Sequence, residues 1–591
     1  MTRRPNADGN GDRPDDSPAA LARLQRRIRV AQGQEAGDLL LTGGRVVNVF
    51  TGQIEPADVV VADGAIAGVG PFQWKARETL DVSGRAILPG LIDAHMHVES
   101  TLLMPAQLAR LVVPHGTTAL VADPHEVGNV LGTRGIEMLL EASRGLALDC
   151  FYMAPSCVPC TSWEHAGAAL DAAAIGELLA RPRMLGLAEV MDFPAVLDAR
   201  EPVLSKVAAA QARCGAVDGH APGLVGQPLV AYAAAGIRSD HESTTVEEAA
   251  AKAALGMLVQ VREGSSARNL DTLLPLIVEG RLGDWCLATD DIHPDDLVRL
   301  GHLDHLLRRL VAGGVPAAEA VRHATLVPAR HYGLRDRGAV APSYRADLVV
   351  VDDLGDFRAH LVVKEGAIVA REGRYVAAHE PPPAPVENTV HVRPMHEPAF
   401  ALDLSAEECP VIGIVPDQIV TRFETQRVAR ANGRWHWDAE RDIVLAARIE
   451  RHRASGQVGL GLVRGFGLRR HGALGSSVAH DSHNLIVAGT NPRDMLACVR
   501  ALEEIGGGFV VVSDGAVQAR LPLPVAGLLS TADADQVCCQ LRAVREAAGA
   551  LGCPLHAPFG TLSFLALSVI PELRITDQGL FDVRKQEFVG L

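Results

Sequence analysis

The chain has 591 residues, of which 48% are hydrophobic and 21% charged, and its formal net charge is −15. Chains of this length divide into several domains, so we expect two or three, each with a buried core. The negative charge repels phosphate backbones and anionic lipids, which excludes nucleic acid and membrane surfaces as expected partners. A small neutral or cationic substrate fits this charge better.

The N-terminal stretch and the cysteines indicate the compartment. Residues 1–18 are rich in Asp, Asn, Gly and Arg and lack the apolar core of a signal peptide, and no later run of about 18 uncharged apolar residues occurs. Ten cysteines are scattered without the spacing of a disulfide scaffold. Cys157 and Cys160 form a C-x-x-C pair with no second pair, so we expect reduced, structural thiols. The protein is predicted to be cytoplasmic.

The N-terminal part of the chain predicts a small β-domain with an extension before it. Residues 1–37 are expected to form a partly disordered extension. Residues 38–86 carry short apolar runs separated by Gly turns, which is typical of small antiparallel strands, and residues 346–380 repeat the pattern. We expect these two stretches to pair into one composite β-sandwich, with the intervening chain inserted between them.

The inserted region has a different pattern. Residues 87–345 alternate β-like apolar segments with Ala- and Leu-rich helical ones, which predicts a parallel (β/α)8 TIM-like barrel as the catalytic domain. The proline-rich stretch 381–385 makes a stiff spacer. Strand-rich runs in residues 387–591 then predict an additional C-terminal α+β domain. The fold class of the whole chain is therefore expected to be α/β.

An apolar segment that ends in His-x-His carries the strongest local signal. It runs from Ile87 to His97, and we interpret it as one strand. Positions i and i+2 of a strand face the same way, so His95 and His97 can bind one metal ion. Barrel enzymes build their sites at the carboxyl ends of the strands, which is where this pair is expected.

Further polar residues follow later strand-like or small-residue segments, in the order of barrel strands. They are Glu189, His220, His241 and Asp290. Together with the His-x-His pair they supply four imidazoles and two carboxylates, which is enough for two divalent ions. The sequence therefore predicts a metal centre at the mouth of the barrel.

With these residues in place, the chain resembles the amidohydrolase superfamily. Further motifs are similar to one branch of it, the bacterial adenine deaminase family. They are Glu99–Thr101, Asp123–Val127, Ala154–Pro159, Gly186–Met191, Gly219–Pro222, Ser239–Glu242, Arg262–Ser265, His480–Asn484 and Leu521–Gly527. The resemblance covers nearly everything from about residue 38 onward, with small departures such as Cys160.

The resemblance implies an activity and a metal content. The activity is hydrolytic deamination of adenine to hypoxanthine and ammonia by a metal-activated hydroxide, in purine salvage or catabolism. The cofactors would be two divalent ions, Mn2+ or Fe2+ in the first place, with Zn2+ as the alternative. By motif, His95, His97 and Asp290 would hold the first ion, His220 and His241 the second, and Glu189 would bridge both.

The resemblance also suggests catalytic roles. Asp290 is expected to act as a general base that takes a proton from water and passes it toward the leaving nitrogen. Glu242 and Glu126 are both candidates for protonating a ring nitrogen of the purine. Three roles remain open for the segment 480–484: covering the active site, binding further metal, or forming a structural turn. A homo-oligomer is expected, with a dimer as the default.

Three alternatives differ in chemistry or substrate. His97 and Glu99 match the H-x-E of zinc nucleoside deaminases, but those also need P-C-x-x-C, and Trp163 stands where the second cysteine would be. Another amidohydrolase acting on a hydantoin or a different purine is the runner-up, because fold and metals do not choose a substrate. A metal-free structural or binding paralogue is disfavoured by the complete ligand set.

Overall fold

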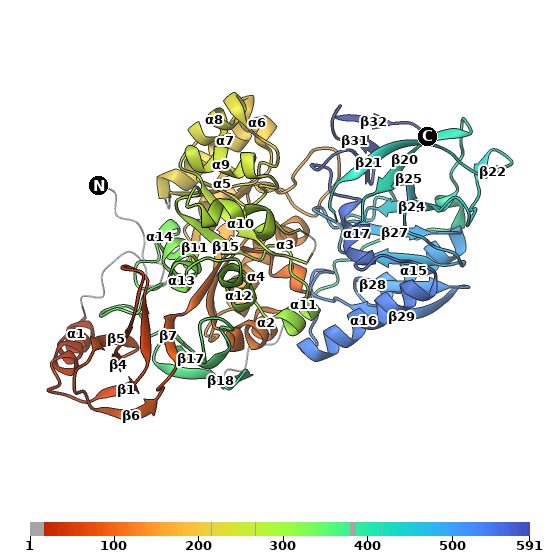
Figure 1. Cartoon of the computed structure of the whole chain (residues 1–591). Coiled ribbons are helices and arrows are strands. Elements are labelled where there is room, and N and C mark those ends of the chain that lie inside the picture. The colour runs from red at the N-terminus through yellow and green to blue at the C-terminus, as the bar shows by residue number, and fades with distance from the viewer. Residues whose placement is uncertain (1–16, 214, 266, 379–385, 417) are drawn as a thin grey trace.

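The computed structural model describes residues 17–213, 215–265, 267–378, 386–416 and 418–591. In Figure 1 the strands of a barrel stand between two smaller sheets, which contain the N-terminal strands and strands from residues 348–375, and a larger sheet formed by the C-terminal third of the chain. Residues 1–16 of the predicted extension lie outside the described residues.

The rest of the predicted N-terminal extension contains helix α1 (Pro18–Ala31). The Ser17 hydroxyl caps the helix by accepting a hydrogen bond from the Ala20 amide at 3.2 Å. Arg26 ties the helix to the first sheet through ion pairs with Asp38 at 2.7 Å and Asp63 at 2.6 Å. This helix is therefore part of the folded structure.

Two sheets pack face to face next to α1. One has the order β5-β4-β1-β6 and the other has the order β19-β18-β17-β16-β7-β2-β3. Their strands are β1 (Gly37–Thr42), β2 (Arg45–Asn48), β3 (Gln53–Pro56), β4 (Asp58–Ala62), β5 (Ala65–Gly70), β6 (Ala76–Asp81), β7 (Ala86–Pro89), β16 (Leu348–Val351), β17 (Ala359–Lys364), β18 (Ala367–Arg371) and β19 (Arg374–Tyr375). Leu41, Val61, Leu348 and Val363 share one buried cluster between the sheets. Strands from both ends of the barrel segment thus meet in one composite sheet.

The structure corrects the reading of Ile87–His97 as one strand. Strand β7 ends at Pro89 and pairs with β16, while β8 (Leu91–Met96) starts after Gly90 and pairs with the next barrel strand. A Cβ atom on Gly90 would lie 2.1 Å from Oγ1 of Thr118. The absence of a side chain at residue 90 lets the chain pass closely over the neighbouring strand as it changes sheets.

Eight parallel strands form the predicted (β/α)8 TIM-like barrel. They are β8, β9 (Thr117–Ala122), β10 (Asp149–Ala154), β11 (Met184–Val190), β12 (Ala216–Gly219), β13 (Ser239–Asp240), β14 (Leu258–Arg262) and β15 (Trp285–Ala288). The amide of Arg238 donates to the carbonyl of Val217 at 3.0 Å and joins β12 to β13. A bridge between Met96 and Asp290 closes the ring between the first and last strands.

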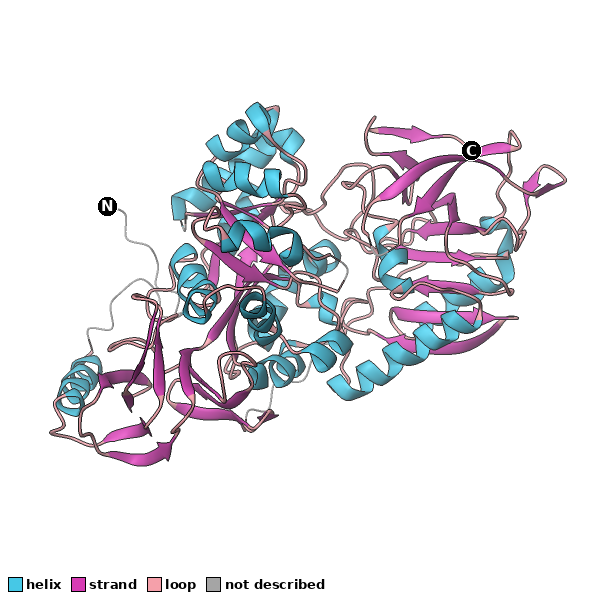
Figure 2. Cartoon of the chain, viewed as in Figure 1, coloured by secondary structure: helices cyan, strands magenta, loops and turns pink. Residues whose placement is uncertain are grey.

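Helices surround the barrel strands, as Figure 2 shows. They are α2 (Pro105–Val112), α3 (His125–Leu131), α4 (Thr133–Ala142), α5 (Ala172–Leu178), α6 (Phe193–Leu197), α7 (Glu201–Arg213), α8 (Gly226–Ala234), α9 (Val246–Ala254), α10 (Leu270–Val278), α11 (Pro294–Leu300), α12 (Leu303–Ala312), α13 (Ala317–His323) and α14 (Leu326–His331). Among the described residues, no helix is long and apolar enough to cross a membrane.

The C-terminal third is built on an eight-stranded sheet of order β21-β20-β25-β24-β27-β26-β28-β29. Its strands are β20 (Glu408–Ile414), β21 (Thr421–Arg427), β24 (Ile443–Ile449), β25 (Val458–Arg464), β26 (Ala473–Ser476), β27 (Leu485–Gly489), β28 (Gly508–Ser513) and β29 (Ala516–Pro522). A small sheet of β30 (Leu573–Thr576), β31 (Gly579–Asp582) and β32 (Glu587–Val589) accompanies it.

Alternate residues of this large sheet bury its two faces separately, as the two-residue period of a strand requires. Helix α15 (Pro492–Glu504) packs with Leu445 and Val487 on one face. Helices α16 (Ala534–Ala550) and α17 (Pro558–Phe564) pack with Val444 and Ile486 on the other face. Helix α17, which covers the second face, and loops near it extend to the barrel mouth.

Candidate metal centre

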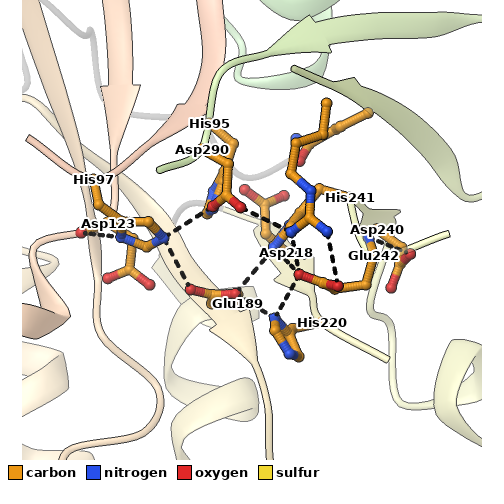
Figure 3. Close-up of polar contacts among 12 residues, drawn as sticks. His95, His97, Asp123, Glu189, Asp218, His220, Asp240, His241, Glu242 and Asp290 are labelled. Carbon is orange, nitrogen blue, oxygen red and sulfur yellow. Dashed lines mark hydrogen bonds and ion pairs between the residues drawn. The ribbon is translucent and has the colours of Figure 1, made fainter. Parts of the chain in front are cut away.

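The His-x-His pair stands at the carboxyl end of β8, as predicted. Nε2 of His95 lies 3.3 Å and Nε2 of His97 lies 3.2 Å from the same oxygen, Oδ1 of Asp290 (Figure 3). Asp290 lies two residues after the end of β15, and its backbone has a positive φ of 55°. The first and last strands of the barrel thus bring three of the predicted ligands together.

Glu189, near the end of β11, lies between two groups of histidines. Its Oε1 atom is 3.4 Å from Nε2 of His97. Its Oε2 atom is 2.7 Å from Nδ1 of His220 and 3.2 Å from Nε2 of His241. Figure 3 shows this carboxylate between His97 and His220, with the other predicted ligands nearby.

The donor set fits a pair of divalent ions. Two atoms that each lie about 2.1 Å from one ion are about 3.0–3.4 Å apart, which matches most separations in this cluster. Nε2 of His95 is buried and has no hydrogen-bond partner among the described residues, although Asp290 is near it. Burial would raise the pKa of the Glu189 carboxyl, but His220 and His241 together outweigh burial, and the pKa lies well below its usual value. An ionised carboxylate is the form that binds such ions.

Two further potential ligands were not singled out from the sequence. Asp123 and His125 follow the end of β9, and Nδ1 of His125 is 3.1 Å from Oδ2 of Asp123 and 3.5 Å from Oε1 of Glu189. Both residues belong to a motif in which only Glu126 was proposed to act. The sequence could have identified them, because this motif directly follows a barrel strand, as the other predicted ligands do.

Arg262, the last residue of β14, holds two acidic side chains of the site. Its Nη1 atom donates to Oδ2 of Asp290 at 2.8 Å, and its Nη2 atom donates to Oε2 of Glu242 at 3.1 Å. Burial would raise the pKa values of both carboxyls, but the Arg262 guanidinium and the neighbouring histidines together outweigh it and lower the pKa of Glu242 and, further, that of Asp290. Both acids are therefore ionised near neutral pH.

Glu126, at the start of α3, is bound by the C-terminal domain. Its Oε1 lies 2.7 Å from Nδ1 of His480, and its Oε2 contacts Nε2 of His483. The Ala479 amide donates to Nδ1 of His483 at 3.1 Å, which leaves the imidazole proton on Nε2, facing Glu126. The pairing places residues 480–484 beside the barrel residue Glu126, and the same three side chains are also close enough together to hold a metal ion.

A buried charge cluster stabilises the backbone next to His220 and His241. Nζ of Lys252 donates to Oδ1 of Asp240 at 2.6 Å and to Oε1 of Glu248 at 2.8 Å. Asp240 in turn accepts hydrogen bonds from the amides of Ala221 at 2.9 Å and Glu242 at 3.0 Å. These amides follow His220 and His241 in sequence, so the cluster fixes the backbone that carries both histidines.

A larger cavity lies at the opposite end of the barrel, next to the composite sheet. It is lined by cations such as Arg337 and Lys364. Both of these side chains pair with Asp149. The cations that line this larger cavity are therefore neutralised in ion pairs. The predicted metal ligands lie instead at the barrel mouth.

Comparison with known proteins gives consistent results across the chain. Residues 86–369 match the amidohydrolase family, and residues 418–587 match the adenine deaminase C-terminal domain. An adenine deaminase of Methanothrix thermoacetophila is 47% identical over 571 residues, covering 96% of this chain and 99% of the relative. An adenine deaminase of Desulfatibacillum aliphaticivorans is 44% identical over 565 residues, covering 95% of this chain and 99% of the relative. Among solved structures, a β-aspartyl dipeptidase of Fervidobacterium islandicum covers 58% of this chain and 99% of its own at 15% identity, with a TM-score of 0.44.

Proposed function

The chain belongs to the adenine deaminase family, and on that basis we propose that it hydrolyses adenine to hypoxanthine and ammonia. The reaction is a C–N bond hydrolysis, and the barrel belongs to the amidohydrolases, which depend on metal ions. The observation that carries the proposal is the meeting of five of the six predicted ligands in one cavity, with His95 beside Asp290, in a chain so similar to adenine deaminases.

We propose that the centre holds two divalent ions, Mn2+ or Fe2+ in the first place, with Zn2+ as the alternative. His95, His97 and Asp290 would hold the first ion, His220 and His241 the second, and Glu189 would contact both. Bound in this way, a pair of divalent ions lowers the pKa of a water molecule toward neutrality, so that it can attack carbon 6 of the purine.

Asp290 is the proposed general base. Arg262 holds its Oδ2 atom at 2.8 Å and thereby points Oδ1 at the centre. From this position Oδ1 takes the proton of the attacking water and delivers it to the departing amino group. The fixed guanidinium keeps the carboxylate ionised before the reaction, which is the state a base needs.

Of the two candidates for protonating a ring nitrogen, Glu126 is better supported than Glu242. Both oxygens of Glu242 contact Arg262, which has no proton to give up at neutral pH. Glu126 is paired with His480 at 2.7 Å. Burial lowers the pKa of His480, but Glu126, with Asp291 and Asp481, outweighs this and raises it to about 9, while the pKa of Glu126 lies well below its usual value. The proton of the pair therefore rests on His480 at neutral pH, and Glu126 would pass it to the ring nitrogen.

The experiment that tests the function is ammonia release by the full-length protein after metal removal and reconstitution. Adenine, adenosine, guanine and hydantoin are compared with Mn2+, Fe2+ and Zn2+ added in steps. We expect turnover of adenine that saturates at two metal equivalents per chain. Turnover of hydantoin without turnover of adenine would assign the chain to a different amidohydrolase reaction.

A further inference from the structure

The cavity that contains the metal ligands has walls of two different kinds. Its inner wall is polar and comes from the barrel, including Glu189, His220, His241 and Asp290. Its outer wall comes from the C-terminal domain and consists of Ile419, His480, Asp481, Phe564, Leu567 and Val569. Four of these six side chains are apolar, so a molecule in the cavity meets ligands on one side and an apolar surface on the other.

The apolar surface is part of a packed cluster. Phe564, Leu567 and Ile570 are buried together, with Ile419 and Val569 packed against them. The ring of Phe564 is stacked on the imidazole of His480, with centroids 4.8 Å apart and planes inclined by 12°. Phe564 is therefore held in one orientation at the end of α17.

The C-terminal domain is fixed against the barrel by buried polar contacts. Arg448 and Glu164 form an ion pair of 2.7 Å, and both side chains are fully buried. The Ser530 amide donates to the Leu102 carbonyl at 2.8 Å. Because these contacts lie outside the cavity, the outer wall does not depend on a bound molecule for its position.

A flat aromatic base matches these two walls. Its polar edge can face the ligands, while one face of its ring is removed from water by apolar and aromatic side chains. Phe564 is the largest apolar side chain in the outer wall. A sugar attached to the base would need additional space between the two walls.

We propose that Phe564, together with Ile419 and Leu567, forms the surface on which the substrate's ring lies, so that the C-terminal domain determines binding of a flat, unsubstituted base. The inference rests on the proposed function, since it names the side chains that bind the base in that same site. Phe564 is a substrate-binding residue in this scheme and has no part in proton transfer.

The test compares Phe564→Leu with Phe559→Leu in the metal-reconstituted, full-length protein. Phe559 lies on the same helix and stacks on Phe509 at 4.6 Å, but it does not line this cavity. Loss of an aromatic contact is expected to raise KM for adenine and Kd for hypoxanthine about threefold to tenfold. The kcat value and the two metal equivalents should stay near those of the wild-type protein, and Phe559→Leu should leave both KM and Kd unchanged.

A second variant keeps the inference testable if Phe564→Leu folds poorly. Ile419 is half-buried in a loop, so Ile419→Ala should fold and still weaken hypoxanthine binding, measured by equilibrium dialysis. Unchanged KM and Kd in the folded variants, with wild-type turnover of adenine, would overturn the assignment of this wall and leave the proposed function intact. An absence of adenine turnover in the wild-type protein would overturn both.

Discussion

Oε1 of Glu189 lies 3.4 Å from Nε2 of His97, while its other oxygen faces His220 and His241. Two divalent ions in this space would repel each other, and an anion between them offsets that repulsion. Glu189→Gln keeps the shape and removes the charge. We expect it to lose at least part of one metal equivalent and to lower adenine turnover by orders of magnitude, measured by elemental analysis and ammonia release.

The matched control for this variant is Glu279→Gln, an exposed side chain at the C-terminal end of barrel helix α10. It should keep two metal equivalents and normal turnover. If Glu189→Gln also kept two tightly held ions and near-normal turnover, the bridging role would have to be assigned to another residue.

His95→Ala and His97→Ala are each expected to lose about one metal equivalent and most of the activity. Each ring supplies one nitrogen near Asp290, and removing a ligand leaves the ion with an incomplete set. His396→Ala, at an exposed position, is the control. Full metal content and full rate in both site variants would argue against a centre at the end of β8.

Adenine is expected to be deaminated far better than adenosine. The outer wall of the cavity comes from the C-terminal domain, so we expect a ribose on the base to meet Phe564 or its neighbours. The ratio of the kcat/KM values for the two substrates measures this. Comparable values would contradict the assignment to free adenine and leave the deaminase chemistry standing.

Lys252→Met is expected to destabilise the barrel by about 3–5 kcal/mol, because it leaves the buried carboxylates of Asp240 and Glu248 without their cation. Metal affinity should fall as well, since Asp240 holds the backbone beside His220 and His241. Urea denaturation and metal titration measure the two effects. Lys75→Met, at an exposed position, is the control and should change neither; wild-type stability in Lys252→Met would contradict the role of the cluster.

His323 is expected to make stability depend on pH. The side chain is 1% exposed and stacks on Trp285, and burial lowers its pKa from 6.5 to about 4. The folded state thus binds fewer protons than the unfolded state between these values, so the His323 contribution is fully present above pH 6.5 and is lost as pH falls toward 4. Between pH 7 and pH 5 the loss should be about 2 kcal/mol.

His323→Phe keeps a ring against Trp285 and removes the titrating group. The free energy of unfolding of this variant should fall less between pH 7 and pH 5 than that of the wild-type protein, by about the same 2 kcal/mol. Other titrating groups are common to both proteins and cancel in the comparison. Identical pH dependence in the two proteins would show that His323 does not titrate as its burial implies.

Local sequence patterns were sufficient for the barrel and for most of the proposed metal centre. Alternation of apolar strands and helices is a property of neighbouring residues, and it predicted the (β/α)8 barrel. His95, His97, Glu189 and Asp290 each stand next to the carboxyl end of such a strand. Because parallel strands all end at the same face of a barrel, their sequence positions alone bring them together.

Tertiary structure decided what depends on contacts between distant residues. The segment Ile87–His97 is divided into two strands at Gly90, where the chain passes close to Thr118, and a strand pattern does not reveal this contact. The pairing of Glu126 with His480, and the place of Phe564 in the cavity, depend on how the C-terminal domain docks on the barrel. Periodicity reports which face of an element is buried but not which partner buries it. The sequence by itself therefore determined the barrel and the side chains at its mouth, and only the folded chain determined which C-terminal residues line the outer side of the site.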